Sequence, residues 1–458
     1  MLQVLANRTY RYLFAAQAIS LIGTGLTTVA LGLLAFDLAG DRAGMVLGTA
    51  LVLKMVAYVG FSPIAGALAS RFDRTRMLVT LDLVRAGFVL GLPFVTEIWQ
   101  IYVLVFAFQL MSAAFTPTFQ ATIPNILQNE EDYTRALSLS RLAYDLEAIL
   151  SPLLAGIMML VISFELLFLG TTLGFLLSAA LVLLAGVPTT ELTTNDEPFA
   201  KRIVRGIQIY LATPRLQGLL CLSFAVSAVG SMIIVNSVVY VREVLGADEH
   251  AYALVLMAVG VGSITAALCV PRLTARFGAR LVMLTGAAML AIIPIAVLAA
   301  DDLPRTLVIW GGLGFAMSLV GTPGGLLLRR SAHEQDRAAI FAAQFSLSHA
   351  CWLVTYPLAG WLGVSVGIPS GFMIMATLAA LGCLGALWRW PPGYSEDIAI
   401  THHHDRLDHE HLHVHDAHHQ HPHEGWEGPE PHRHPHRHRA VTHSHVFVID
   451  DHHPIWPR

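Results

Sequence analysis

Long apolar segments alternate with short polar ones over most of this chain. Each apolar segment is close to the ~20 residues that an α-helix needs to cross ~30 Å of hydrocarbon. The pattern therefore predicts an all-α membrane protein with twelve transmembrane helices. The expected spans are residues 13–37, 44–68, 77–96, 99–122, 136–160, 164–186, 218–241, 251–272, 281–300, 305–328, 338–365 and 368–389.

The sequence repeats its landmarks about 205 residues apart. Arg71-Phe72 returns as Arg276-Phe277, and Thr116-Pro117 returns as Thr322-Pro323. A repeat of this length, made of apolar segments, indicates two homologous bundles and not a solenoid of small units. We expect two pseudo-symmetric six-helix bundles, over residues 1–187 and 218–390. A linker with a basic, amphipathic end joins them over residues 188–217, and a tail of different composition follows over residues 391–458.

Lysine and arginine gather in every second turn between the spans. The turn after the second span holds Arg71, Arg74 and Arg76, whereas the turn after the first holds only Arg42. By the positive-inside rule, the arginine-rich turns and both termini are expected in the cytoplasm. The prediction is a multi-pass protein of a bacterial inner membrane, with the first helix uncleaved.

The composition narrows the functional class. With 55% hydrophobic and 13% charged residues, and a mean hydropathy of +0.60, an ordinary soluble protein is excluded. No Gly-Lys-Ser/Thr phosphate loop and no nucleophile motif occurs in the sequence, so we expect neither an enzyme nor ATP-driven transport. We expect no prosthetic group and no nucleic-acid partner. We also expect the protein to be a monomer that is surrounded by the lipid bilayer.

Ionisable residues inside spans are the candidates for transport, because burying a charge in a membrane is costly and usually functional. Lys54 lies in the middle of the second span, and the fifth span carries Arg141, Asp145 and Glu147. Lys54 needs a carboxylate partner, which either Asp145 or Glu147 could supply. Arg141 and Asp145 could instead be a neutralised structural pair. The predicted transport and proton-coupling residues are Asp145, Glu147, Lys54 and Arg141.

The turn after the second span resembles the helix 2–3 signature of the major facilitator superfamily, of the type G-x-L-x-D-R-x-G-R-R/K. Gly66, Leu68 and the three arginines match it, but Ser70 replaces the usual acid and Asp73 replaces the second glycine. The resemblance implies that this loop latches the two bundles in one gating state, with Asp73 in place of the missing acid. The gating residues that we expect are Gly66, Arg71, Asp73, Arg74, Arg76, Asp82 and Arg85.

The tail has a chemistry of its own. Of the 22 histidines in the chain, all except His250, His333 and His349 lie after residue 390, mixed with acids, prolines and arginines. Such a segment cannot bury a core and is predicted to be disordered. Neutral imidazole binds Ni²⁺, Co²⁺, Cu²⁺ and Zn²⁺. The predicted metal ligands are His402, His403, His404, His409, His411, His413, His415, His418, His419, His421, His423, His432, His434, His436, His438, His443, His445, His452 and His453.

A superfamily transporter with such a tail resembles the nickel-resistance exporters of the NreB type. The resemblance implies export of Ni²⁺ or Co²⁺ from the cytoplasm by proton antiport, conferring metal resistance, with Zn²⁺ as a further ion for the tail. Two alternatives stay open: a drug or metabolite exporter whose tail only senses or buffers metal, and a metal-regulated importer. The fourth span lacks the Arg-Gln-Gly motif of many drug/proton antiporters and has Gln109-Leu110-Met111 instead.

Overall fold

The computed structural model describes residues 2–69, 73–127, 130–187, 199–331 and 337–392, together with four short stretches of the tail. Within some helices only the backbone is described. Twelve long helices occupy the predicted spans. Most begin and end within about five residues of the expected bounds, but the fifth begins six residues earlier and the ninth ends eight residues earlier than predicted. They are α1 (Arg8–Ala39), α2 (Ala43–Ala69), α3 (Arg74–Gly91), α4 (Ile98–Ile126), α5 (Glu130–Met159), α6 (Phe164–Ala185), α8 (Pro214–Val239), α9 (Glu249–Phe277), α10 (Ala279–Ile292), α11 (Leu303–Arg330), α12 (Arg337–Ser365) and α13 (Ile368–Arg389).

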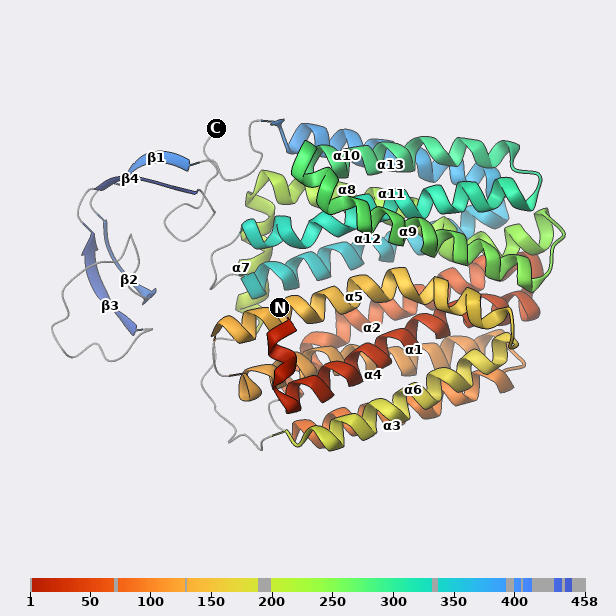
Figure 1. The fold of residues 1–458 in the computed structure, drawn as a ribbon, viewed down its shortest axis with the longest axis horizontal. Helices are drawn as coiled ribbons and strands as arrows, with labels where there is room; N and C mark the ends of the chain where they lie inside the picture. The colour runs from red at the N-terminus through yellow and green to blue at the C-terminus, as the bar shows by residue number, and fades with distance from the viewer. Residues whose placement is uncertain are drawn as a thin grey trace.

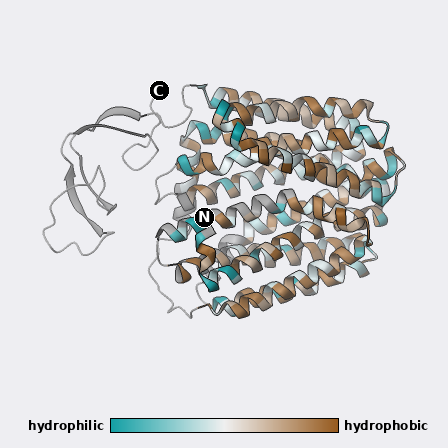
Figure 2. Cartoon of the chain, viewed as in Figure 1, coloured by the Kyte–Doolittle hydropathy of each residue, from teal (hydrophilic) through white to brown (hydrophobic). Residues whose placement is uncertain are grey.

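The helices run side by side, and α1 begins at the same end of the molecule at which α13 ends (Figure 1). Among the described residues, nine segments are long and apolar enough to cross a membrane, and the first of them runs through α1 and most of α2. Apolar residues cover the lengths of the helices, whereas hydrophilic residues gather at their ends (Figure 2). Large apolar side chains such as Leu173, Val308 and Trp388 are exposed on the outside. This is the surface expected of a protein whose solvent is lipid.

Short helical turns complete or link the long helices. The 3-10 turns are η1 (Leu2–Ala6), η2 (Gly40–Arg42), η3 (Leu92–Phe94) and η5 (Ile293–Ala299), and the π-helical turn η4 (Tyr240–Val244) extends α8. One further helix, α7 (Phe199–Ala212), forms where the sequence predicted an amphipathic end to the linker, and it lies across the ends of the long helices (Figure 1). Its residues Gly206 and Tyr210 pack on α12, and the Tyr210 hydroxyl donates a hydrogen bond to Gln344.

The first six helices pack mainly on one another, and so do α8 to α13; the extensive contacts between the two sets are α2 with α12 and α5 with α9. Glycines let these helices approach closely. A Cβ atom added to Gly48 would lie 2.9 Å from the Tyr356 carbonyl oxygen of α12. One added to Gly156 of α5 would lie 2.6 Å from the Ala253 carbonyl oxygen of α9. Small residues at such crossings are typical of helices packed in membranes, where close backbone contact replaces the hydrophobic effect.

A buried ion pair holds the first set of helices together. Asp82 and Arg85 of α3 have side chains that are 0% and 3% exposed, and they bond to each other. The Arg85 guanidinium also donates to the Ser20 hydroxyl of α1 at 3.0 Å, and the Ser178 hydroxyl of α6 donates to Asp82 at 2.8 Å. These bonds satisfy charges that would otherwise be prohibitively costly inside the bundle.

Arg85 makes a second kind of contact with two neighbouring helices. Its guanidinium carbon lies 4.2 Å from the ring centroid of Phe115 in α4 and 4.5 Å from that of Phe175 in α6. Cation–π contacts at such distances gain strength where water is excluded. The pair that the sequence placed among the gating residues therefore ties α1, α3, α4 and α6 to one another.

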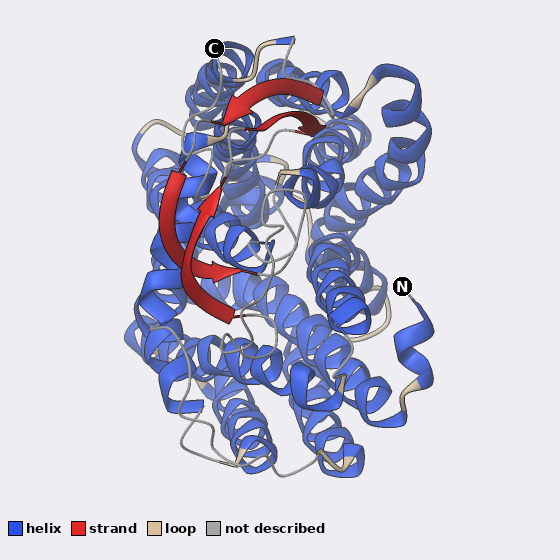
Figure 3. Ribbon diagram, turned by 90° about the vertical axis from the view of Figure 1, so that its left-hand side faces the viewer, coloured by secondary structure: helices blue, strands red, loops and turns tan. Residues whose placement is uncertain are grey.

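The prediction of a disordered tail is wrong for the described part of it. Two antiparallel ribbons form there: β1 (Ala399–His404) pairs with β4 (Val441–Val446), and β2 (Leu407–His413) pairs with β3 (His432–His438). The strands lie beyond the end of the helices (Figures 1 and 3). Alternation with a period of two is compatible with strand pairing without a buried core, and β1 and β4 contain the β-branched residues that favour strands. Composition alone did not reveal this alternation as a structural signal.

The buried pair leads to a stability prediction. Asp82→Asn leaves the Arg85 charge without its carboxylate, which in a buried pair costs about 3–5 kcal/mol. We expect a clearly lower midpoint of thermal unfolding in detergent, and partial recovery in the double variant Asp82→Asn/Arg85→Met, which removes both charges. The matched control is Asp301→Asn, which breaks the exposed pair between Asp301 and Arg305 and is expected to change little. Equal effects of Asp82→Asn and Asp301→Asn would contradict this role.

The glycine crossings give a second prediction. Gly48→Ala forces α2 away from α12, because the added methyl group meets backbone and not a flexible side chain. Overpacking of this kind costs about 1–3 kcal/mol. Gly87→Ala in α3 is the matched control, since a Cβ atom there meets nothing within 4 Å. We expect a lower midpoint of thermal unfolding for Gly48→Ala than for Gly87→Ala. Equal midpoints for the two variants would contradict the close approach of α2 and α12.

Candidate functional site

Lys54 and Glu147 are two oppositely charged residues of different helices that lie close enough to interact. Lys54 comes from the middle of α2 and Glu147 from the middle of α5, and the two opposite charges interact electrostatically. Both side chains are half-buried, so each keeps part of its surface accessible. Of the two carboxylates that the sequence offered to Lys54, the structure places Glu147 next to it.

The surroundings of Glu147 come from three more helical positions. A Cβ atom added to Gly25 of α1 would lie 2.7 Å from Glu147 Oε1 and closer still to Ser151 Oγ, so both polar groups reach the α1 backbone. Ser151 follows Glu147 by four residues and shares its face of α5. Its buried hydroxyl has no hydrogen-bond partner among the described residues. Tyr356 of α12 is 6% exposed and lies close enough to interact electrostatically with Glu147.

Tyr356 brings the second set of helices to this pair. Its backbone carbonyl meets Gly48 of α2, and its ring lies 5.0 Å from that of Trp352. Sequence reasoning did not single out Tyr356, although it directly precedes Pro357 within a segment that repeats in both halves. Only the tertiary structure shows that it lies near Glu147. We call Lys54, Glu147, Ser151 and Tyr356 the central polar cluster.

Aromatic rings continue the same contact between α2 and α12. Tyr58 of α2 stacks on His349 of α12 with ring centroids 5.9 Å apart and planes 6° apart, and Phe345 lies 3.9 Å from His349. The His349 Nδ1 atom lies 2.7 Å from the Phe345 carbonyl oxygen, a hydrogen bond within the helix. His349 therefore contributes to the helix contact by stacking, and the central polar cluster borders this contact.

Several predicted residues lie elsewhere. Asp82 and Arg85 sit in their own buried network, and the tail histidines belong to strands beyond the helices or to undescribed stretches. Asp73 is the N-cap of α3, its carboxylate accepting from the backbone N–H of Arg76 at 2.8 Å. This capping is a local task, typical of aspartate at that position. Arg71 and the side chains of Arg141 and Asp145 lie outside the described residues, and of Gly66 only its place in α2 is described.

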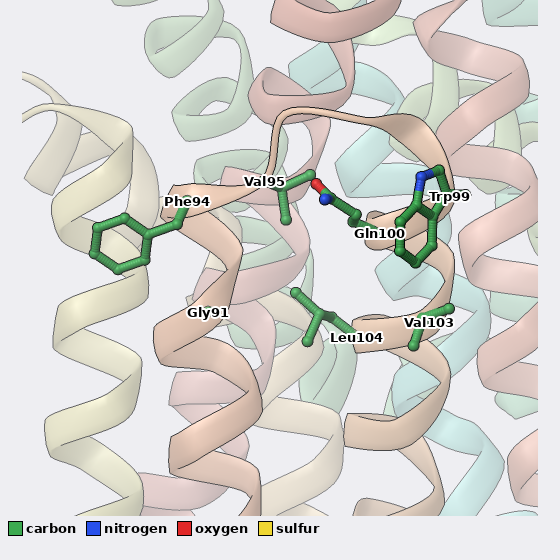
Figure 4. Close-up of a pocket in the computed structure, with 7 residues that line it drawn as sticks. All are labelled: Gly91, Phe94, Val95, Trp99, Gln100, Val103 and Leu104. Carbon is green, nitrogen blue, oxygen red and sulfur yellow. The ribbon is translucent and has the colours of Figure 1, made fainter.

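The described side chains offer little to a metal ion within the helices. No group of three or more His, Cys, Asp or Glu side chains among them is placed to hold one. A pocket of about 290 Å³ opens at the turn between α3 and α4 (Figure 4). Its lining is apolar apart from Gln100. The Gln100 side chain accepts hydrogen bonds from the backbone N–H groups of Thr96 and Glu97, just before α4. Phe94 and Trp99 in this lining are largely exposed. This pocket has no ionisable lining residue and is distinct from the central polar cluster.

The cluster contains one carboxylate, that of Glu147, which is a group that can take up and release a proton. In apolar surroundings an ionised carboxylate neutralises the charge of a neighbouring lysine. A protonated carboxylate leaves the charge of that lysine without a partner. The cluster lies where the two sets of helices meet, as substrate sites do in transporters built from two repeats.

Among the solved structures with a similar fold are the two transporters below, at sequence identities that show the fold alone. The nucleoside transporter NupG superposes with a TM-score of 0.62 at 15% identity, covering 84% of this chain and 99% of that one. The POT family transporter PepTSo superposes with a TM-score of 0.64 at 12% identity, covering 84% and 97%.

Curated relatives match over part of the chain. Macrolide efflux protein A of Streptococcus pyogenes is 26% identical over 204 residues, which is 43% of this chain and 50% of that protein. The uncharacterized MFS-type transporter YfiS of Bacillus subtilis is 31% identical over 171 residues, 37% of this chain and 40% of that protein. The chain thus spans about half the length of these relatives or less. The sequence profile of the Major Facilitator Superfamily matches residues 13–237 and 219–405, most of the chain. This multi-pass membrane protein belongs to the Major Facilitator Superfamily.

Proposed function

We propose that this transporter exports a small amphiphilic organic compound, of the kind that macrolide antibiotics represent, in exchange for protons. The observation that carries the proposal is the pairing of Lys54 with Glu147 next to Tyr356, at the contact between the two sets of helices. The likeness to macrolide efflux protein A supports the direction of transport and the class of substrate. Both termini are proposed to face the cytoplasm of a bacterial cell, as the distribution of arginines favours.

Glu147 is proposed to carry the proton. While Glu147 is ionised, its charge neutralises Lys54 and both can stay within the helices. When Glu147 takes up a proton, Lys54 becomes an uncompensated charge. The protein then favours arrangements in which Lys54 reaches water. Protonation thus biases the equilibrium between the inward-open and outward-open states, which is the condition for coupling.

The crossings of α2 with α12 and of α5 with α9 are the contacts that have to separate during this change. Gly48 lies in the first of them, near the start of α2, and Gly156 lies in the second, near the end of α5. Breaking contacts between backbones and small residues costs little compared with pulling apart interlocked large side chains, because fewer atoms lose their neighbours. Tyr356 belongs to the crossing of α2 with α12 and lies near Glu147. A change of charge at the Glu147 carboxylate therefore acts directly on this crossing.

A double-variant cycle tests this coupling. Glu147→Gln should lower proton-driven macrolide efflux from reconstituted vesicles at least tenfold, because the amide cannot exchange a proton. Lys54→Met should lower it as well, through the lost charge partner. The double variant Lys54→Met/Glu147→Gln should be closer to wild type in thermal stability than Glu147→Gln alone, since it contains no unpaired charge. It should remain inactive in proton-driven transport.

The control for this cycle is Glu165→Gln, which removes an exposed carboxylate from the first turn of α6. We expect its efflux to match wild type. If Glu147→Gln exported the macrolide at the wild-type rate under the same proton gradient, Glu147 would not be the proton carrier.

A second candidate function is the export of Ni²⁺ or Co²⁺, with Zn²⁺ also bound by the tail, as the resemblance to the NreB type implies. The specific observation in its favour is the concentration of histidines after residue 390. In this version the tail collects the ion near the cytoplasmic mouth and raises its local concentration. The relatives' names and the lack of a described metal-ligand group within the helices favour the organic substrate.

Truncation after Pro392 separates the two functions. An exporter of organic compounds should transport the macrolide at the same rate with and without the tail, because no described residue of the tail lies among the helices that carry the central polar cluster. A metal exporter should lose Ni²⁺ efflux at low Ni²⁺ and retain it at high Ni²⁺. The measurement is the rate of efflux from vesicles that contain the full-length or the truncated protein and are loaded with either the macrolide or Ni²⁺. Wild-type vesicles that move Ni²⁺ but no macrolide would overturn the proposed function.

A further inference from the structure

The pocket at the turn between α3 and α4 opens on the outside of the helices. Its lining includes Phe94 and Trp99, which are 77% and 62% exposed, and Val103, one turn further along α4, is exposed as well. In a membrane, apolar side chains on the outside of a helical protein contact lipid and not water. The pocket is therefore a hollow in the lipid-facing surface of the first six helices.

The pocket lies where apolar helix gives way to a polar turn. The chain passes through α1, α2 and α3 before it reaches the pocket, which places the pocket at the end of the helices opposite the start of α1. In Figure 4 the ring of Trp99 stands beside α4, with the indole nitrogen at the edge nearest the turn. A tryptophan in this orientation is typical of the interface between membrane and water. The pocket thus lies at the depth where lipid headgroups meet acyl chains.

The inside of the pocket suits an alkyl chain. The one polar side chain in its lining, Gln100, already accepts hydrogen bonds from the backbone N–H groups of Thr96 at 2.8 Å and Glu97 at 3.1 Å. Gly91 has no side chain to fill the space toward Leu104, whose nearest atom would lie 3.5 Å from an added Cβ atom. The volume of about 290 Å³ is at the lower end of small-molecule sites, which hold ~300–1,000 Å³. This space takes a segment of an acyl chain and is too small for a whole macrolide.

The charge beside the pocket is negative. Glu97 is exposed, lies in the turn between Val95 and Trp99, and is the single charged residue in the sequence from 86 to 129. A carboxylate attracts an ammonium group and accepts its hydrogen bonds, and a primary ammonium group has three N–H donors, whereas a quaternary one has none. Neither α3 beyond Arg85 nor α4 contains a cation that would hold an anionic headgroup in place.

We propose that this pocket is a binding site for a phospholipid with a primary ammonium headgroup, such as phosphatidylethanolamine. One acyl chain occupies the pocket between α3 and α4, the indole of Trp99 lies along the upper part of that chain, and the ammonium group pairs with Glu97. With both termini in the cytoplasm, as proposed above, the lipid belongs to the outer leaflet. The site does not depend on which substrate crosses the membrane, so its test is independent of transport.

Quenching of tryptophan fluorescence by lipids with brominated acyl chains tests this site in the full-length protein in vesicles. The signal of Trp99 is the part of the fluorescence that Trp99→Phe removes. At equal mole fractions, brominated phosphatidylethanolamine should quench this signal about threefold more effectively than brominated phosphatidylcholine or phosphatidylglycerol, because an exposed ion pair adds a modest free energy. Glu97→Gln should make the three lipids equal. Glu97→Lys should shift the preference to phosphatidylglycerol, whose headgroup is anionic.

A variant of the pocket itself tests the place of the acyl chain. Gly91→Leu fills the space next to Leu104 and leaves Glu97 unchanged, so it should remove the preference for phosphatidylethanolamine at Trp99. Glu97 is exposed, so its variants do not disturb packing, and they test the site even where Gly91→Leu lowers stability.

Trp361 is the matched control. It is also exposed, it lies near the end of α12 at the same end of the helices, and it is not in the lining of the pocket. The signal that Trp361→Phe removes should show no preference among the three lipids. Equal quenching of Trp99 by all three lipids, the same preference at Trp361, or a preference that survives Gly91→Leu would each overturn the site. Displacement of the brominated lipid from Trp99 by a macrolide would also overturn it, because the pocket would then hold the transported compound.

Discussion

A charge buried among helices in a membrane has to be neutralised by a neighbouring group, and this constraint organises the protein. Asp82 and Arg85 satisfy it permanently, through each other and through hydroxyl groups of α1 and α6. Lys54 and Glu147 satisfy it with a single partner each among the described charges, next to a contact between two sets of helices. The first arrangement is fixed by many bonds. The second, as we propose, changes when Glu147 takes up a proton.

The difference between the two pairs follows from their surroundings. The Arg85 guanidinium lies between two aromatic rings and carries hydrogen bonds to two other side chains, so that any movement breaks several contacts at once. Glu147 reaches the α1 backbone at Gly25 and is half-buried. A pair that is partly accessible and bordered by a glycine crossing can respond to protonation at a lower cost. The rigid pair thus supports the set of helices that contains the proposed proton carrier.

The tail obeys a different constraint, because its sequence contains few of the apolar residues from which an interior could form. Its strands depend on backbone pairing and on what their faces present to the solvent. The backbone register of β2 and β3 sets a histidine opposite a histidine at three positions.

The sequence by itself determined the helices, because about twenty apolar residues in a row have few alternatives to spanning a bilayer. All twelve predicted spans are helical, and most of their ends lie within about five residues of the predicted ends. The superfamily signature at Gly66–Arg76 indicated the family to which the chain belongs. It also identified Lys54 and Glu147 as costly residues, since hydrophobic periodicity makes any interior charge conspicuous. Only the tertiary structure decided that these two meet each other, that Tyr356 from the other half joins them, and that the tail histidines pair across strands. Such contacts join residues far apart in the chain, and no local pattern specifies which of several possible partners a side chain reaches.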